Sequence, residues 1–525
     1  MAEPTDHRLA AAAFAVLAAL HLLPVWLPAY LPTTDGPAHV YNAWILRGLV
    51  AGNAPEAIDA HFELNARPFP NWLGHVLLAG LSAAVPPQVA EKLLATGYLL
   101  LLYGGAWFLA AATGQAERWW LLAILPLGHN QLFQHGFYNF ALSFALLPWI
   151  LGVWWRHRDG PTPRFAWVVN LLLWACWFAH PLSFAAAGVF IAVLWLASLR
   201  ERDWRRSALH VAVLLPQLLL PLWFRRGRGG PEWDPHWSLE RTAEYFGRLE
   251  ALVTFDRAQL WVSGALAAVI LALLLRTLWA RGGSEPARGV DVFLLLAALA
   301  TLLVFWAPSG WGGGYLVKER LSLYPWLLLV PGLATGWRAR TQRAVAAALA
   351  LLALANLALL LPRAVERGSE VATFVRAAEL VPRGARVLVL RWERRYPVDA
   401  LSHAIGYAAL ARGLVDWDDY EAKHDHFPVR FRPTVTLPEL GQMLSFPPNL
   451  AVRDNRRLID AVYTWKMPPQ QRVRTALSRW YEPVVASPGA EIWVRRDFVE
   501  SLEEPEPPPR PARRRGWRGG RVPSP

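Results

Sequence analysis

Long apolar stretches recur through most of this chain. Runs of roughly 15 to 24 residues begin near Leu9 and continue to Pro362, and the short segments between them hold most of the charge. Runs of this length cross the hydrocarbon core of a bilayer as helices, because a helix satisfies every backbone polar group within one segment. The chain is therefore predicted to be an α-helical polytopic membrane protein.

The apolar runs predict about eleven transmembrane helices. The stretch 71–85 is shorter than a span and is predicted to dip into the membrane without crossing it. The predicted spans are approximately 9–31, 88–112, 119–130, 137–155, 165–179, 181–198, 208–224, 260–279, 290–307, 320–337 and 344–362.

The net charge of +13 reflects topology and does not indicate nucleic-acid binding. Arg is concentrated in short loops, which are predicted to be cytoplasmic together with the N-terminus. The protein is then expected in the inner (plasma) membrane of a bacterium, and its outer segments are 32–70, 225–257 and everything after Arg363. The cytoplasmic loops are too short to bind a nucleotide sugar, and the chain has neither a Walker A loop nor a dinucleotide fingerprint.

Residues 1–362 are predicted to form the membrane domain, and residues 363–500 a small extracytoplasmic α/β domain. ARVLVLRW and EIWVRRD have the composition of strands. The Pro-, Arg- and Gly-rich tail 501–525 is predicted to be disordered. Within the outer domain, the acidic run at 416–419 and the pair His424 and His426 have only loose metal spacing, and a solvated surface is their ordinary interpretation.

The first outer segment begins with TTDGPAHVYNA. Asp35 directly follows a span, and His39 lies one helical turn later on the same face. A carboxylate held near the membrane surface can act as a general base on an acceptor hydroxyl or as a metal ligand. The alternative is structural, because Asp35 followed by Pro37 is also a common helix start.

Further along the same segment, HFELNARPFPNW contains His61 and Glu63. These two residues could add a second acid/base position or bind a divalent metal, although exposed His and Glu near a membrane are usually only solvated. The single cysteine, Cys176, lies inside a predicted span and excludes both an intramolecular disulfide and a thiolate metal cluster.

Two other segments place polar residues at the outer mouth of the predicted bundle. In GHNQLFQHGFYNF, His135 and Asn139 could contact sugar hydroxyls or phosphate, or could satisfy helix ends. In WGGGYLVKERLSLYPW, a glycine run is followed by Tyr315, Lys318 and Arg320, which together could cradle a lipid-linked phosphate. The alternative for the basic pair is snorkelling to lipid head groups.

Three of these segments resemble motifs of the GT-C superfamily of membrane glycosyltransferases, which includes the protein mannosyltransferases and the aminoarabinose transferases. TDGPAHVYNA resembles the acidic motif that opens the first outer loop, ARPFPNWLGHVL resembles the segment that returns to the membrane, and YLVKERLSLYPWLLLVPGL resembles a late basic-aromatic motif. The resemblance implies a GT-C-like fold, a catalytic role for Asp35 and phosphate contacts for Lys318 and Arg320. The segments GFYNFALSFALLPW and YEAKHDHFPVRF are also similar to uncharacterised bacterial membrane proteins of this layout.

Two functions are compatible with these residues and motifs. The first is transfer of a sugar from a polyprenyl-phosphate donor to an acceptor on the outer face of the membrane, with Asp35 as base and the basic pair stabilising the leaving phosphate. The second is a non-enzymatic role in envelope assembly or in transport of lipid-linked substrates. Membrane lipids are partners in either case, and a divalent metal is left open as the only cofactor.

Overall fold

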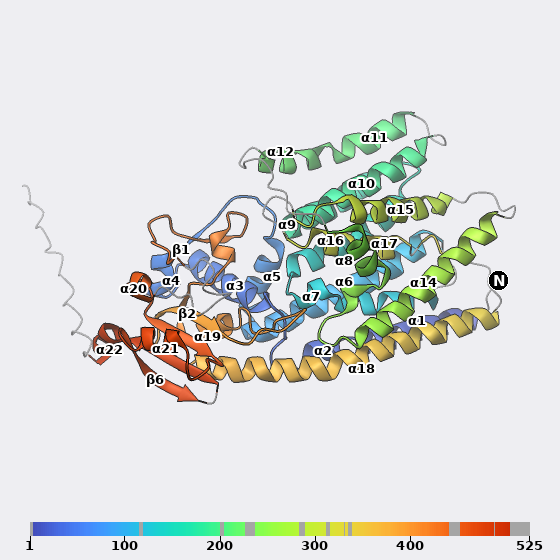
Figure 1. Ribbon diagram of the computed structural model, residues 1–525. Coiled ribbons are helices and arrows are strands. Elements are labelled where there is room, and N and C mark those ends of the chain that lie inside the picture. The colour runs from blue at the N-terminus through green and yellow to red at the C-terminus, as the bar shows by residue number, and fades with distance from the viewer. Residues whose placement is uncertain are drawn as a thin grey trace, which may run out of the picture.

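A bundle of helices occupies most of the molecule, and a small sheet lies at one end of it (Figure 1). The computed structural model describes residues 4–114, 119–199, 204–225, 237–282, 289–310, 315–329, 331–333, 339–439, 452–487 and 489–503. The predicted disordered tail and the glycine run at 312–314 lie almost wholly outside these residues.

Seven helical segments among the described residues are long and apolar enough to cross a membrane. Two shorter apolar helices, α9 (Pro163–Ala179) and α10 (Pro181–Ala197), have similar composition. The seven segments comprise α1 (Pro4–Leu20) with α2 (Leu23–Trp26), α6 (Pro87–Ala112), α8 (Tyr138–Arg156), α11 (Trp204–Leu214) with η4 (Leu215–Leu218) and α12 (Leu219–Arg225), α14 (Gln259–Gly282), η6 (Gly289–Asp291) with α15 (Val292–Trp306), and α18 (Ala339–Ala378).

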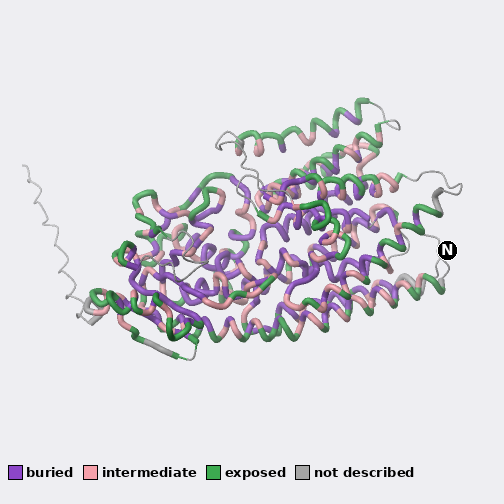
Figure 2. The backbone as a smooth tube through the Cα atoms, in the orientation of Figure 1, coloured by how far each residue is buried: buried purple, intermediate pink, exposed green. Residues whose placement is uncertain are grey.

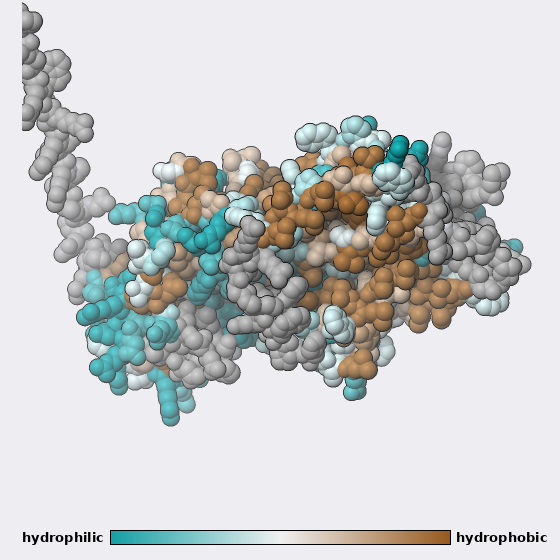
Figure 3. All heavy atoms as spheres, turned by 90° about the horizontal axis from the view of Figure 1, so that it is seen from above, coloured by the Kyte–Doolittle hydropathy of each residue, from teal (hydrophilic) through white to brown (hydrophobic). Residues whose placement is uncertain are grey.

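The surface of the bundle is apolar where a bilayer would surround it. Figure 3 shows hydrophobic residues over the helices and hydrophilic residues gathered at the sheet end. Helix α14 carries an exposed tryptophan near each end, Trp261 (85% exposed) and Trp279 (74% exposed). At 1.5 Å per residue these two side chains are about 27 Å apart along the helix, close to the thickness of the hydrocarbon core. This spacing is that of tryptophans at the two membrane interfaces.

Two of the eleven predicted spans form only short helical pieces among their described residues. The segment 119–130 forms two 3-10 helices, η1 (Trp119–Ile124) and η2 (Pro126–His129), because Pro126 interrupts the backbone hydrogen bonding. The described part of 320–337 contains only the end of α16 (Val317–Leu321) and the short helix α17 (Tyr324–Leu328), whose second residue is Pro325. Both segments are nevertheless largely buried among the longer helices (Figure 2).

The stretch predicted to dip into the membrane is short in the structure. It forms α5 (Leu73–Leu81), whose nine residues measure about 14 Å, less than half of what a span requires. Helix α5 packs against α3 (Gly36–Ala51), the helix that follows the first span, and against α6 and α8. The first outer segment therefore returns to the bundle through α5.

The C-terminal unit is built on a five-stranded sheet. Its strand order is β3-β2-β5-β7-β6, with β2 parallel to both β3 and β5, and with β7 antiparallel to β5 and β6. The strands are β2 (Arg386–Arg391), β3 (Val415–Asp416), β5 (Ala461–Trp465), β6 (Tyr481–Ser487) and β7 (Ala490–Arg495). The accompanying helices are α19 (Ile405–Arg412), η7 (Glu421–Lys423), α20 (Val452–Asn455), α21 (Arg472–Leu477) and α22 (Arg496–Glu503). Strand β2 is buried along almost its whole length, as its β-branched sequence predicts.

A long helix and a strand pairing both join this unit to the bundle. Helix α18 continues through Pro362 and runs along the whole length of the molecule to the sheet (Figure 1). In addition, β1 (Phe62–Leu64) of the first outer segment pairs antiparallel with β4 (Val429–Phe431) of the C-terminal unit. The β1–β4 pairing brings the start of α3 and the loop after β3 together.

The remaining described helices are α4 (Glu56–His61), α7 (Gln131–Gln134), α13 (Leu239–Gly247) and η5 (Glu250–Leu252).

Candidate functional site

Asp35 occupies the N-cap position of α3, but its side chain makes no capping hydrogen bond. The backbone around it is held in place, because the Asp35 N–H donates to the carbonyl oxygen of His135 (2.9 Å). Gly136 follows with a φ of 82°, and a Cβ there would lie 2.4 Å from the backbone nitrogen of Gly36. Glycine is required for this close approach. The carboxylate of Asp35 is therefore positioned by the loop and left free for other contacts.

The contacts of the Asp35 carboxylate come from the C-terminal unit. The hydroxyl of Tyr420 donates to Asp35 Oδ2 (3.0 Å), and His403 Nε2 lies 3.7 Å from Oδ1. On its other side, His403 Nδ1 lies 3.9 Å from Asp418 Oδ2. Burial raises the pKa of Asp35 above its ordinary value, and the electrostatic interactions of its carboxylate with His403 and His39 oppose that shift. A carboxylate with a raised pKa is a stronger base.

One helical turn after Asp35, His39 belongs to a second buried cluster. His39 Nδ1 lies 2.7 Å from Glu421 Oε1, and His75 Nε2 of α5 lies 2.6 Å from Glu421 Oε2. Burial by itself would raise the pKa of Glu421, but His39 and His75 more than offset it and hold the pKa well below its ordinary value. Imidazole and carboxylate are transition-metal ligands, and the ligand atoms of these three side chains all lie within 4.8 Å of one another.

Arg320 belongs to α16, in the bundle. Its charge interacts electrostatically with that of Asp35. The guanidinium lies over the rings of Phe137 (4.7 Å) and Phe140 (5.7 Å), and Nη1 donates to the carbonyl oxygen of Tyr315 (2.6 Å). Its Nε is buried without a hydrogen-bond partner, and no carboxylate of the described residues forms an ion pair with Arg320. A guanidinium placed in this way is suited to binding an anion.

Of the other residues singled out in the sequence, His135 lies closest to this arrangement. Its Nδ1 is 3.4 Å from Thr34 Oγ1, and its ring stacks on Phe137, the ring over which Arg320 lies. Tyr315 is 69% exposed and meets Arg320 only through its backbone. His135 and Arg320 thus flank the segment that carries Asp35.

Lys318 and Asn139 are engaged in structural contacts. The buried ammonium of Lys318 donates to the carbonyl oxygens of Val304 (2.9 Å) and Phe305 (3.2 Å) at the end of α15, where helix carbonyls lack partners. Asn139 Oδ1 accepts from the Gly74 N–H (2.7 Å), which fixes the start of α5. These contacts account for both side chains without a substrate.

His61 and Glu63 lie at the pairing of β1 with β4. Arg430 donates to Glu63 Oε1 through Nη2 (2.7 Å) and Nε (2.8 Å), and the His61 ring packs on Trp417. The structure therefore separates these two residues from the His39 cluster. The solvated interpretation of the acidic run is wrong for Asp416 and Asp419, which are 3% and 0% exposed, because β3 packs against α4 and α19 and the following η7 packs against α3.

Sequence reasoning missed four residues of this arrangement, namely His75, His403, Tyr420 and Glu421. His75 and Glu421 lie within segments that carry a family resemblance, but neither is distinguished there by local spacing. It also missed Glu91 of α6, whose carboxylate accepts hydrogen bonds from Tyr138 of α8 and Tyr407 of α19. A buried acid in an apolar helix was the available signal for Glu91, since such residues need partners.

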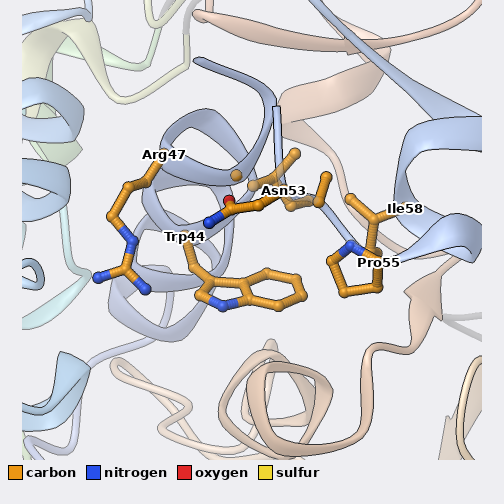
Figure 4. Close-up of a pocket in the computed structure, with 8 residues that line it drawn as sticks. Trp44, Arg47, Asn53, Pro55 and Ile58 are labelled. Carbon is orange, nitrogen blue, oxygen red and sulfur yellow. The ribbon is translucent and has the colours of Figure 1, made fainter. Parts of the chain in front are cut away.

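A pocket on the surface lies away from these residues (Figure 4). It is lined by Trp44, Arg47, Asn53, Pro55 and Ile58, with Ile45, Gly48 and Ala54. Trp44 follows Asp35 by more than two helical turns, so the pocket is about 14 Å or more along α3 from the carboxylate. None of its labelled side chains is an acid, a histidine or a thiol.

Comparison with known proteins supports the architecture. No family model matches the sequence, and no curated protein matches it. Among solved structures, the chain is similar to the crystal structure of ArnT from Cupriavidus metallidurans in the apo state, with a TM-score of 0.51 and 15% identity over 94% of this chain and 99% of that chain. At this identity the likeness concerns the fold alone. The chain thus has an ArnT-like helical fold with helices apolar enough to cross a membrane and a small C-terminal sheet unit. The predicted fold class, a polytopic α-helical membrane protein with a small C-terminal α/β unit, is confirmed.

Proposed function

We propose that this protein is a membrane glycosyltransferase that moves a sugar from a polyprenyl-phosphate donor to an acceptor at the outer face of the membrane. The observation that supports this most is the position of Arg320, a guanidinium without a carboxylate partner among the described residues. It lies over the ring of Phe137, which stacks on His135, and the carbonyl oxygen of His135 accepts the N–H of Asp35. Transfer of a sugar from a phosphate requires a base for the acceptor and an anion-binding group for the leaving phosphate. The likeness of the fold to ArnT is consistent with this chemistry.

In the proposed reaction, Asp35 accepts the proton of an acceptor hydroxyl or amine as that group attacks the anomeric carbon of the sugar. The bond from that carbon to the phosphate oxygen breaks, and Arg320 stabilises the charge that develops on the departing polyprenyl phosphate. Tyr420 and His403 hold the carboxylate in place. A single displacement of this kind inverts the configuration at the sugar carbon.

Turnover in vesicles tests this function. The full-length protein is reconstituted with a panel of polyprenyl-phosphate sugars and with a membrane extract that supplies acceptors. We expect release of free polyprenyl phosphate that depends on the extract. Movement of the intact donor between leaflets without release of polyprenyl phosphate would support the transport alternative.

The proposal also requires Asp35 and Arg320 to face the extracytoplasmic side. In a Cys176→Ser background, single cysteines are placed at the exposed positions Tyr315 and Tyr396, and at Asp159 in a predicted cytoplasmic loop. A membrane-impermeant maleimide applied to spheroplasts is expected to label the first two, and to label Asp159→Cys only after permeabilisation. Labelling of Tyr315→Cys and Tyr396→Cys from opposite sides would rule out the shared site.

A further inference from the structure

His39, His75 and Glu421 come from three separate segments and meet in the interior. His39 lies on α3, His75 on α5 and Glu421 at the start of η7, and they are 4%, 0% and 0% exposed. Phe427 covers them, with its ring centroid 6.4 Å from that of His39 and 5.7 Å from that of His75. A buried carboxylate needs a positive charge close to it. The protonation of the two histidines decides whether protons or a bound cation supply that charge.

The hydrogen bonding of His75 determines which of its nitrogens carries a proton. His75 Nδ1 lies 2.9 Å from the carbonyl oxygen of Asn71, which can only accept, so Nδ1–H donates there. In the neutral ring, Nε2 then carries a lone pair, and this atom lies 2.6 Å from Glu421 Oε2. A lone pair and a carboxylate oxygen repel each other at this distance unless a positive centre lies between or beside them. A backbone acceptor on the opposite nitrogen is also the arrangement that orients metal-binding histidines.

The geometry of His39 argues that this positive centre is more than a proton. Glu421 Oε1 lies 2.7 Å from His39 Nδ1, yet it is buried without any aligned hydrogen bond. His39 Nδ1 instead faces His75 Nε2 at 3.3 Å. A proton on His39 Nδ1 would point at His75 Nε2 and not at Glu421 Oε1, so it would not satisfy this carboxylate oxygen. A cation between them accepts both lone pairs and both carboxylate oxygens at once.

The separation of the two nitrogens agrees with a known coordination geometry. With Zn–N bonds of about 2.0–2.1 Å, two ligands of a tetrahedral zinc ion are about 3.3–3.4 Å apart, which the two nitrogens match at 3.3 Å. The nitrogen–oxygen separations of 2.7 and 2.6 Å are shorter, so the Glu421 carboxylate has to move back by a few tenths of an ångström to share the ion. Two neutral imidazoles and one carboxylate are ligands of the type and number found in zinc sites that keep one open position. The hard cations Mg²⁺ and Ca²⁺ prefer oxygen ligands and do not suit two histidines.

We propose that His39, His75 and Glu421 bind one divalent transition-metal ion of the zinc class. The ion joins the first outer segment and α5 to the loop after β3 of the C-terminal unit. Because Tyr420 directly precedes Glu421 and donates to Asp35, the ion also sets the position of that hydroxyl against the carboxylate. The proposal does not depend on the glycosyltransferase function, since an ion that only fastens the two parts would bind in the same way.

Metal analysis of the full-length protein tests this site. The protein is purified in detergent without chelator or added metal, and its metal content is measured by mass spectrometry. We expect about one zinc per chain in the wild type and at least a tenfold loss in Glu421→Gln and His75→Gln. The matched controls His61→Gln and Glu63→Gln, from the same outer segment, are expected to keep the wild-type content.

A second measurement uses the wild type alone and does not depend on whether the variants fold. Protein treated with a chelator is titrated with Co²⁺, whose visible absorption is intense in tetrahedral sites with nitrogen and oxygen ligands and weak in octahedral ones. We expect a saturable tetrahedral spectrum with one ion per chain, and a lower Tm after chelation. A wild type without stoichiometric metal and without this spectrum overturns the proposal, as does metal retention in folded Glu421→Gln and His75→Gln.

Discussion

Asp35→Asn is expected to lower kcat for sugar transfer by about 10²–10⁴-fold, the range that a general base contributes. The substitution keeps the shape of the side chain, and an amide oxygen can still accept the hydrogen bond from Tyr420. The loss then reports the missing base and not a displaced loop. The measurement is release of polyprenyl phosphate by reconstituted protein, with Tm recorded for the same preparation.

Glu63→Gln is the matched control for this substitution. Glu63 is a carboxylate of the same outer segment, but it pairs with Arg430 at the β1–β4 junction. A partly exposed ion pair of this kind contributes about 0–1 kcal/mol to stability, so the variant is expected to fold and to turn over within about twofold of the wild type. Wild-type turnover by Asp35→Asn would remove the proposed mechanism.

Arg320→Ala is expected to reduce kcat/KM by about 10²–10³-fold, because it removes the charge that stabilises the leaving phosphate. Arg320→Lys keeps the charge but loses the planar donors and the stacking over Phe137 and Phe140. We expect intermediate turnover from the lysine variant. The readout is initial rate against donor concentration for the three proteins.

Arg205→Ala is a suitable control for the loss of a positive charge, because Arg205 lies at the start of α11, at the predicted cytoplasmic end of that helix and away from the candidate site. Its turnover is expected to match that of the wild type. Equal kinetics for wild type, Arg320→Ala and Arg320→Lys would show that the guanidinium does not contact the phosphate. In that case its aromatic contacts would be purely structural.

The sequence was sufficient for the architecture of the membrane part, because a bilayer imposes a simple rule on composition. Apolar runs such as 88–112 and 137–155 correspond closely to α6 and α8, and the short stretch after Asn71 forms only the nine-residue α5. The rule failed at 119–130 and 320–337, which are apolar but form only short helices in their described residues. These segments are buried by other helices. Apolar side chains are favoured in a protein interior as they are in lipid, so composition alone does not distinguish the two.

The sequence also determined that Asp35 and Arg320 are unusual, since each is a charge placed at the edge of an apolar span. Only the tertiary structure decided which partners they and their neighbours have. Glu421 meets His39 and His75 because β1 pairs with β4, and Lys318 turns to the end of α15 because α16 packs there. Such contacts depend on packing between distant segments, and the spacing of residues within one segment does not predict that packing.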